Sequence, residues 1–236
     1  MIQAIVFSNN SPNFLDIFLQ SAKDNEISIF DFTILYNTLE VNEYSYKKVF
    51  YKYGISKFVK ETSFKENLMS IIGQDNTGLI SFFKDTNYFF SKLPMFNIEE
   101  IMSDENMFCF SLGLGRNIKQ DFNNNVENIL IEEECKYENT IQWNWVKHYL
   151  SFGRPLELGS GHIFHKKEIA KMFKKSKYNS IQSLEESFEA FENYPKELMS
   201  SFENSVLVDI FARTEDFIDN LNAFDFSKLE KQIIEI

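Results

Sequence analysis

Apolar positions in residues 1–90 follow two alternating periods. Short apolar runs, which are typical of β-strands, occupy residues 3–8, 27–36, 56–61 and 78–83. Between them, apolar residues recur every three to four positions, as in amphipathic helices, at 11–24, 43–54 and 64–73. This alternation of strand and helix predicts right-handed βαβ units and a mainly parallel central sheet flanked by helices, a Rossmann-like α/β fold.

Residues at the ends of two predicted helices support these boundaries. Ser11 stands at the N-cap of the first helix and Pro12 at its first helical position, where the lost N–H costs nothing. Gly54 follows the second helix, where glycine readily adopts the left-handed conformation that ends a helix. These residues predict where both helices begin or end.

The pattern is less regular in the second half of the chain. Residues 107–115 form a strand candidate that ends in glycines, and 141–150 carries both tryptophans. The remaining segments are a polar excursion at 121–140, a glycine-rich loop running into a helix at 155–173, a helix broken near Pro195 at 183–202, a strand at 205–211 and an amphipathic helix at 214–236. No repeat or linker-like composition interrupts the chain, so we expect one domain over residues 1–236.

Composition excludes several classes of protein. The 236 residues include 35 acidic and 24 basic side chains, a net charge of −11, which repels nucleic acid and anionic membranes. Cys109 and Cys135 are too few for a secreted disulfide scaffold. The N-terminus lacks a basic signal-peptide region, and no run approaches the roughly 20 apolar residues of a transmembrane helix. We therefore expect a cytoplasmic protein.

Polar residues gather where the predicted strands end. In mainly parallel sheets, ligands bind beyond the carboxyl ends of the strands, and we expect a site there. The residues at these ends are Phe7-Ser8-Asn9, Tyr36-Asn37 and Lys84-Asp85-Thr86-Asn87.

The order of short motifs over most of the chain resembles bacterial glycosyltransferases of the GT-A fold, similar to family 2. The motifs are "IVFSNNSP", "TILY", "FKENL", the apolar strand that runs into Asp85-Thr86-Asn87, "FCFSLGLGRNI", "WNW", "GSGHIFHKKEI" and "NSIQSLE". The resemblance implies transfer of a sugar from a nucleotide-diphosphate sugar, most often a UDP-sugar, to a glycan or other acceptor in surface polysaccharide synthesis. It also implies a nucleotide-binding half at 1–90 and an acceptor-side half with C-terminal helices at 91–236.

The family's metal motif of two acids falls on Asp85-Thr86-Asn87. The resemblance implies that Asp85 and Asn87, with His162, hold Mn²⁺ or Mg²⁺ at the donor diphosphate. An asparagine amide offers an oxygen but no charge, so we expect weak metal binding. Ser11 and Ser160 replace an arginine and an aspartate that are common in the family. These replacements keep open an alternative: a GT-A-fold binding or interaction protein with impaired catalysis.

The resemblance assigns further roles. It places Asp85 and Glu185 in catalysis and Trp143 and Trp145 at the acceptor. The nucleotide-binding set that it implies is Phe7, Ser8, Asn9, Tyr36, Lys84 and Asp85.

Each assignment has a structural alternative. A strand-end Asp-x-Asn pair is typical of a turn, because both side chains bond to local backbone. Tyr36, Trp143 and Trp145 can be packing residues instead, as strand aromatics often are. Glu185 opens a helix, where a carboxylate suits the positive end of the dipole.

Lys84 offers a substitute for the metal. Strict alternation along the strand points its side chain away from that of Asp85. A bulge or turn there would bring the Lys84 ammonium to the diphosphate, where it could supply the positive charge. Otherwise Lys84 only solvates the strand end.

Overall fold

The computed structural model describes residues 1–95, 97–118, 120–121, 126–127, 137–148, 158–188 and 196–210. Within these residues, eight strands form one sheet in the order β3-β2-β1-β4-β10-β6-β11-β9. Their bounds are β1 Ile2–Asn9, β2 Phe30–Asn37, β3 Phe58–Lys60, β4 Leu79–Lys84, β6 Met107–Ser111, β9 Thr140–Asn144, β10 Ser160–His165 and β11 Leu198–Phe202. Strands from both halves of the chain thus share one sheet.

Strands β3, β2, β1 and β4 run parallel to one another. Strand β10 lies antiparallel between β4 and β6, β11 runs parallel to β6, and β9 lies antiparallel to β11 at the edge. The predicted mainly parallel central sheet is therefore confirmed. Outside this sheet, β5 (Asn87–Phe89) pairs with β12 (Leu207–Asp209), and β7 (Gln120–Asp121) pairs with β8 (Val126–Glu127).

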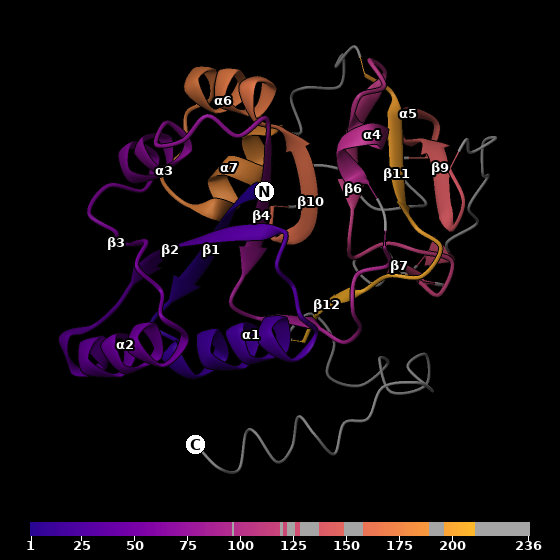
Figure 1. Cartoon of the computed structure of the whole chain (residues 1–236). Coiled ribbons are helices and arrows are strands. Elements are labelled where there is room, and N and C mark those ends of the chain that lie inside the picture. Colours follow the sequence, from indigo (N-terminus) through magenta and orange to yellow (C-terminus); the bar gives the residue numbers. More distant parts are fainter. Residues whose placement is uncertain are drawn as a thin grey trace.

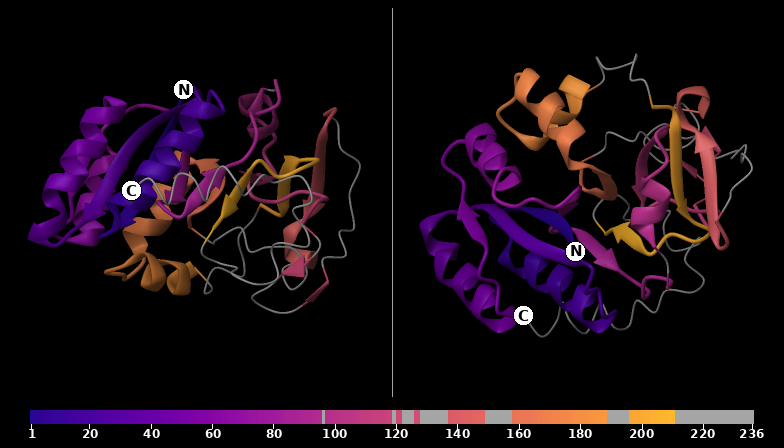
Figure 2. Two further views of the ribbon diagram at one scale, coloured as in Figure 1. Left: turned by 90° about the horizontal axis from the view of Figure 1, so that it is seen from below. Right: turned by 45° about the horizontal axis from the view of Figure 1, so that its top comes forward.

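Helices cover both faces of the sheet (Figure 1). On one face lie α1 (Pro12–Asp24) and α2 (Glu40–Tyr53), and on the other α3 (Phe64–Ile72), α6 (Lys166–Lys175) and α7 (Ile181–Phe188). The short helices α4 (Ile98–Met102) and α5 (Trp145–His148) flank β6, β11 and β9 (Figure 2). None of the helices in the described ranges is long and apolar enough to cross a membrane.

The boundaries of the first two helices agree with the predictions. Pro12 is the first residue of α1, and Ser11 is its N-cap, although the Ser11 side chain does not bond to the helix. Gly54 ends α2 in the left-handed conformation, with φ 64°. The hydroxyl of Ser11 is therefore available for another partner.

Two predictions for the second half are wrong. Residues 198–202, expected to be helical, form β11 between β6 and β9, where Ser200 Oγ donates to the Ile141 carbonyl at 2.8 Å. Residues 160–165, expected to lie in a loop and helix start, form β10, whose pairing with β4 is irregular between Ser160 and Ile163. Tertiary pairing overrides local pattern in both strands.

Three other predicted segments have different outcomes. Strand β9 covers only the start of 141–150, because Trp145 begins α5. The polar segment at 121–140 is described only in part, and the predicted helix at 214–236 lies outside the described residues.

Candidate functional site

The carboxyl end of β4 turns immediately after Lys84. Asp85 and Thr86 form a turn, and β5 begins at Asn87. The Asp85 N–H donates to the Phe7 carbonyl at 3.0 Å, which ties the end of β4 to the end of β1. Asp85 and Asn87 therefore do not lie in one extended segment, because the turn separates them.

Asp85 is anchored to the loop between β1 and α1. Its side chain is buried, and Oδ2 accepts hydrogen bonds from Ser8 Oγ at 2.6 Å and from Ser11 Oγ. Tyr46 of α2 joins the same network: its hydroxyl lies 2.7 Å from Ser8 Oγ and accepts from the Ser11 N–H at 3.0 Å. The Asp85 carboxylate thus holds together β1, β4 and the start of α1.

Opposing effects act on the pKa of Asp85. Burial raises this pKa above its usual value, and the nearby carboxylate of Asp209 raises it further. Hydrogen bonds from Ser11, Ser8 and the Asn9 backbone favour the charged form and act in the opposite direction. The net direction is upward, so burial outweighs these hydrogen bonds.

Asn87 also bonds within the turn. It is 1% exposed, and its Oδ1 accepts from the Lys84 backbone N–H at 2.9 Å. Its Nδ2 is buried without a hydrogen-bond partner. Across the β5–β12 ladder, Asn87 pairs with Asp209. The amide oxygen expected to meet a metal therefore already has a backbone donor.

At the carboxyl end of β4, the side chain of Lys84 lies on the opposite face of the sheet from that of Asp85. Its Nζ is 4.0 Å from Glu185 Oε1 of α7, and both side chains are partly exposed. Its aliphatic chain runs against Gly159, where an added Cβ would meet Lys84 Cγ at 2.5 Å. Gly159 has φ +94°, a backbone conformation that favours glycine. A second polar group, Lys84 with Glu185, thus lies at the carboxyl end of β4, packed against Gly159.

His162 does not approach Asp85. It is 3% exposed in β10, and its ring lies 6.0 Å from that of Phe164, which packs in the cluster beneath α3 and α6. Asp85 instead faces Tyr46 and α2 through Ser8. In the described ranges, no three His, Cys, Asp or Glu side chains gather as a metal site. Because Asp85 and Asn87 already accept hydrogen bonds and His162 lies on the opposite face, these residues as arranged do not fit a divalent ion.

The expected nucleotide-binding residues differ in exposure. Phe7 is buried against Phe64 and Phe82. Tyr36 is buried with its ring 4.8 Å from that of Tyr46, and burial raises its pKa. Asn9, by contrast, is exposed at the end of β1. Together with the partly exposed Lys84, Asn9 is thus open to a ligand, whereas Phe7 and Tyr36 are packing residues in this arrangement.

The two tryptophans expected at the acceptor are buried. Trp143 is 0% and Trp145 7% exposed. The Trp145 Nε1–H donates to the Lys196 carbonyl at 2.9 Å, and its ring lies 5.6 Å from that of Phe108. Neither indole is an exposed sugar platform here, and the acceptor site stays a prediction.

Two residues that contribute to the carboxyl end of β1, Tyr46 and Asn10, were not predicted as site residues from the sequence. Tyr46 had no predicted role, because a tyrosine on the inner face of an amphipathic helix is usually part of the core. Asn10, with φ 53°, accepts from the Leu39 N–H at 3.1 Å and from Asn42 Nδ2 at 3.0 Å. Asn10 thereby ties the β1–α1 loop to α2, and the Asn9-Asn10 pair after a strand was the available signal for it.

No family model matches the chain, and no curated protein matches it in sequence. Among solved structures, Staphylococcus aureus TarS aligns with a TM-score of 0.53 and 9% identity over 100% of this chain and 42% of TarS. A TarS 1–349 structure aligns with a TM-score of 0.51 and 10% identity over 88% of this chain and 59% of that one. The same TarS fragment in complex with UDP-GlcNAc aligns with a TM-score of only 0.47, at 9% identity over 100% of this chain and 71% of that one.

The chain thus shares the fold of GT-A glycosyltransferases while spanning well under two thirds of the length of TarS.

Proposed function

We propose that the chain binds a nucleotide-diphosphate sugar at the carboxyl ends of β1 and β4 and transfers the sugar to a glycan or other acceptor. The observation that carries the proposal is the GT-A-like fold with Lys84 at the end of β4, where ligands bind in such sheets. TarS 1–349, which shares the fold, has been crystallised with UDP-GlcNAc, and a UDP-sugar is therefore the first donor to test.

The proposed chemistry uses Lys84 and Glu185. The acceptor hydroxyl attacks the anomeric carbon, the bond from that carbon to the diphosphate breaks, and its electron pair leaves with the diphosphate. Glu185 takes the proton of the acceptor hydroxyl. The Lys84 ammonium, 4.0 Å from Glu185, stabilises the charge that develops on the leaving phosphate. No step is assigned to a divalent ion, because Asp85 and Asn87 already accept hydrogen bonds from the protein.

A second candidate function is a donor-binding protein with impaired transfer. The favouring observation is the altered metal motif: Asn87 brings no charge and bonds to the Lys84 backbone, and His162 lies on the other face of the sheet. Such a protein binds the same nucleotide but releases no sugar from it. The two proposals therefore share a ligand and differ in turnover.

Titration calorimetry against UDP, UDP-sugars and the matching cytidine and guanosine compounds tests the shared ligand. We expect a UDP-sugar to bind both with Mn²⁺ and with EDTA. Absence of binding by every nucleotide contradicts both functions. Binding that requires Mn²⁺ contradicts the role of Lys84 in place of a metal.

Measurement of UDP released from the bound donor separates the two functions. Release that persists in EDTA and is lost in Lys84→Ala supports the transferase. Tight donor binding without release for any donor and acceptor tested supports the binding protein instead.

A further inference from the structure

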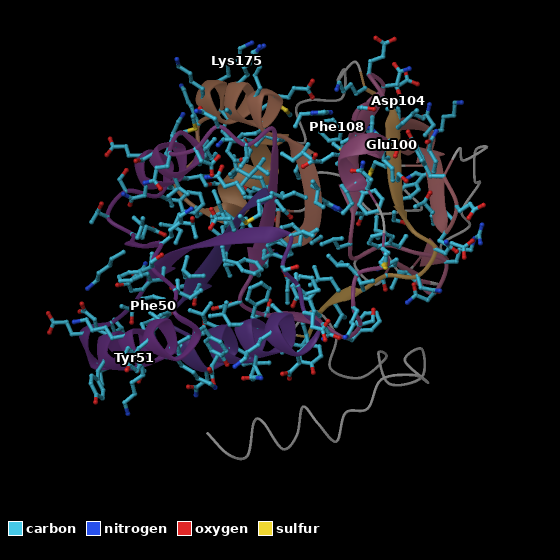
Figure 3. All side chains as sticks on the ribbon, viewed as in Figure 1. Phe50, Tyr51, Glu100, Asp104, Phe108 and Lys175 are labelled. Atoms are coloured by element: carbon cyan, nitrogen blue, oxygen red, sulfur yellow. The ribbon has the colours of Figure 1, made fainter. Side chains whose placement is uncertain are left out.

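Helix α2 carries two stripes on opposite sides. Tyr46, Val49 and Phe50 form the inner stripe and are buried in the core. On the outer side, Val41 is 78% and Tyr51 91% exposed. Figure 3 labels Phe50 on the sheet side of the helix and Tyr51 on its outer side. The described part of the chain leaves this outer side in solvent.

The outer residues are spaced as in a helix–helix seam. Val41, Tyr44, Lys48 and Tyr51 follow one another at intervals of three, four and three positions, which places them in one line along the helix. Tyr44 is 69% exposed, and Lys48 Nζ lies 4.7 Å from the centre of its ring. We call these four residues the outer seam. Contiguous exposed aromatic surface of this kind typically marks an interface.

Further apolar surface adjoins the outer seam. Leu39, just before α2, is 64% exposed, and Phe58 of the edge strand β3 is 44% exposed. A shallow depression lies beside the C-terminal end of the seam and is lined by Lys47, Phe50, Tyr51, Gly54, Ile55 and Phe58. The other exposed large apolar residues of the described ranges, Met1, Met95 and Val146, belong to other segments of the chain.

We propose that the outer seam is a dimer interface at which α2 of a second copy packs antiparallel. In this arrangement Val41 meets Tyr51 of the partner subunit, and Tyr44 meets Lys48 of the partner subunit. Each layer then pairs an aromatic ring with an aliphatic or cationic side chain, and the cation–π contact at Tyr44 becomes intermolecular.

The charge pattern of α2 selects the antiparallel direction. Glu40 and Glu43 lie in its first turn, whereas Lys47, Lys48 and Lys52 lie in its second half. Parallel packing would bring like charges together. Antiparallel packing brings each acidic end to a basic end and opposes the two helix dipoles.

The depression supplies a reason for a second copy rather than an unrelated helix. Antiparallel packing brings the partner subunit's Leu39 to the C-terminal end of α2, beside Gly54 and Ile55 in the depression. The partner subunit's Glu40 then approaches Lys47 on the rim of the depression. The same chain thus carries both the projecting apolar residue and the depression that receives it, as a two-fold interface requires.

Sedimentation of the full chain over a wide concentration range tests the dimer. We expect a monomer–dimer equilibrium, and Tyr51→Glu should raise the dissociation constant about tenfold or more by placing a charge in the seam. The matched control is Met95→Glu, at a residue that is 103% exposed and lies outside α2, and it should leave the equilibrium unchanged. A wild-type chain that stays monomeric, or a dimer indifferent to Tyr51→Glu, overturns the proposal.

Cysteine cross-linking tests the direction. Chains carrying Val41→Cys are mixed with chains carrying Tyr51→Cys, both with Cys135→Ser; Cys109 is fully buried and stays. A disulfide requires its two Cα atoms within roughly 7 Å, so antiparallel packing should cross-link the mixture but neither variant by itself. Each variant cross-linking by itself as well as the mixture does would contradict the antiparallel dimer. Because both positions are highly exposed, we expect neither cysteine to disturb folding, and circular dichroism of each variant checks this.

Discussion

Lys84 and Asp85 are neighbours in sequence, but at the carboxyl end of β4 their side chains lie on opposite faces of the sheet. Asp85 is buried and accepts hydrogen bonds from Ser8 and Ser11. Lys84 is partly exposed, and its ammonium lies 4.0 Å from the carboxylate of Glu185. One side is therefore a closed hydrogen-bonded anchor, and the other keeps a cation within reach of solvent.

The difference separates structural from ligand-binding polar groups. A buried carboxylate that already accepts several hydrogen bonds contributes to the stability of the loop that it holds. A partly exposed ammonium contributes little to stability but can attract an anionic diphosphate. We therefore expect substitution of Asp85 to act on folding and substitution of Lys84 to act on nucleotide binding.

Asp85→Ala should have the largest effect. Removing this carboxylate leaves the hydroxyls of Ser8 and Ser11 without their buried acceptor, and the free energy of unfolding should fall by about 3 kcal/mol. Urea denaturation measures this loss. A change below about 1 kcal/mol would show that Asp85 contributes little to stability and would contradict its role as a structural anchor.

Gly159→Ala should come next. Its Cβ would meet Lys84 Cγ at 2.5 Å in a backbone conformation that disfavours alanine, and we expect a loss of about 2 kcal/mol in unfolding free energy. Gly78→Ala is the matched control, because its added Cβ would meet no atom within 4 Å. Equal denaturation midpoints for the two variants would mean that Lys84 is not held against Gly159.

Lys84→Ala should separate binding from folding. It removes a partly exposed ion pair, and the unfolding free energy should change by less than about 1 kcal/mol. Its affinity for a UDP-sugar should fall about tenfold, or about 1.4 kcal/mol, in titration calorimetry. The control is Lys92→Ala, which breaks an exposed ion pair with Glu26 and should leave affinity unchanged. Equal affinities of the two variants would show that Lys84 does not contribute to donor binding.

The sequence was informative where local signals agreed with the fold. Apolar periodicity together with Pro12 and Gly54 placed α1 and α2 correctly. Strand β11 was missed because its central Ser200 and Ser201 are small polar residues that satisfy their hydroxyls on backbone carbonyls. Such a strand is defined by its neighbours on both sides, which no local window contains.

The strand ends at which we propose a site were predictable from the sequence, but the contacts made there were not. Strand order identified the edge that carries Lys84 and Asp85, and alternation correctly put their side chains on opposite sides. The turn at Asp85, however, is stabilised by a bond from the Lys84 backbone to Asn87 and by hydroxyls of Ser8 and Ser11, which are distant in sequence. Sequence spacing could not show that the side chains of Asp85 and Asn87 already accept hydrogen bonds within the protein.

The smallest effect concerns pH and uses Asp85→Asn. Burial raises the pKa of Asp85 in the folded chain above its usual value. Between the unfolded and folded pKa values, the native state keeps a proton that the unfolded state has released, so stability falls as pH rises through this window. Asp85→Asn lacks this titration, and all other groups are common to both chains.

The stability of wild type relative to Asp85→Asn should therefore decrease as pH rises from about 4 towards neutrality. Urea denaturation of both chains at several pH values measures the difference, at low protein concentration because the sequence pI is about 4.9. A difference that increases with pH would mean that the hydrogen bonds from Ser8, Ser11 and Asn9 outweigh burial. Asp85 would then be held as a stabilised charge, closer to the metal-binding carboxylate that the sequence suggested than to the buried anchor on which the comparison rests.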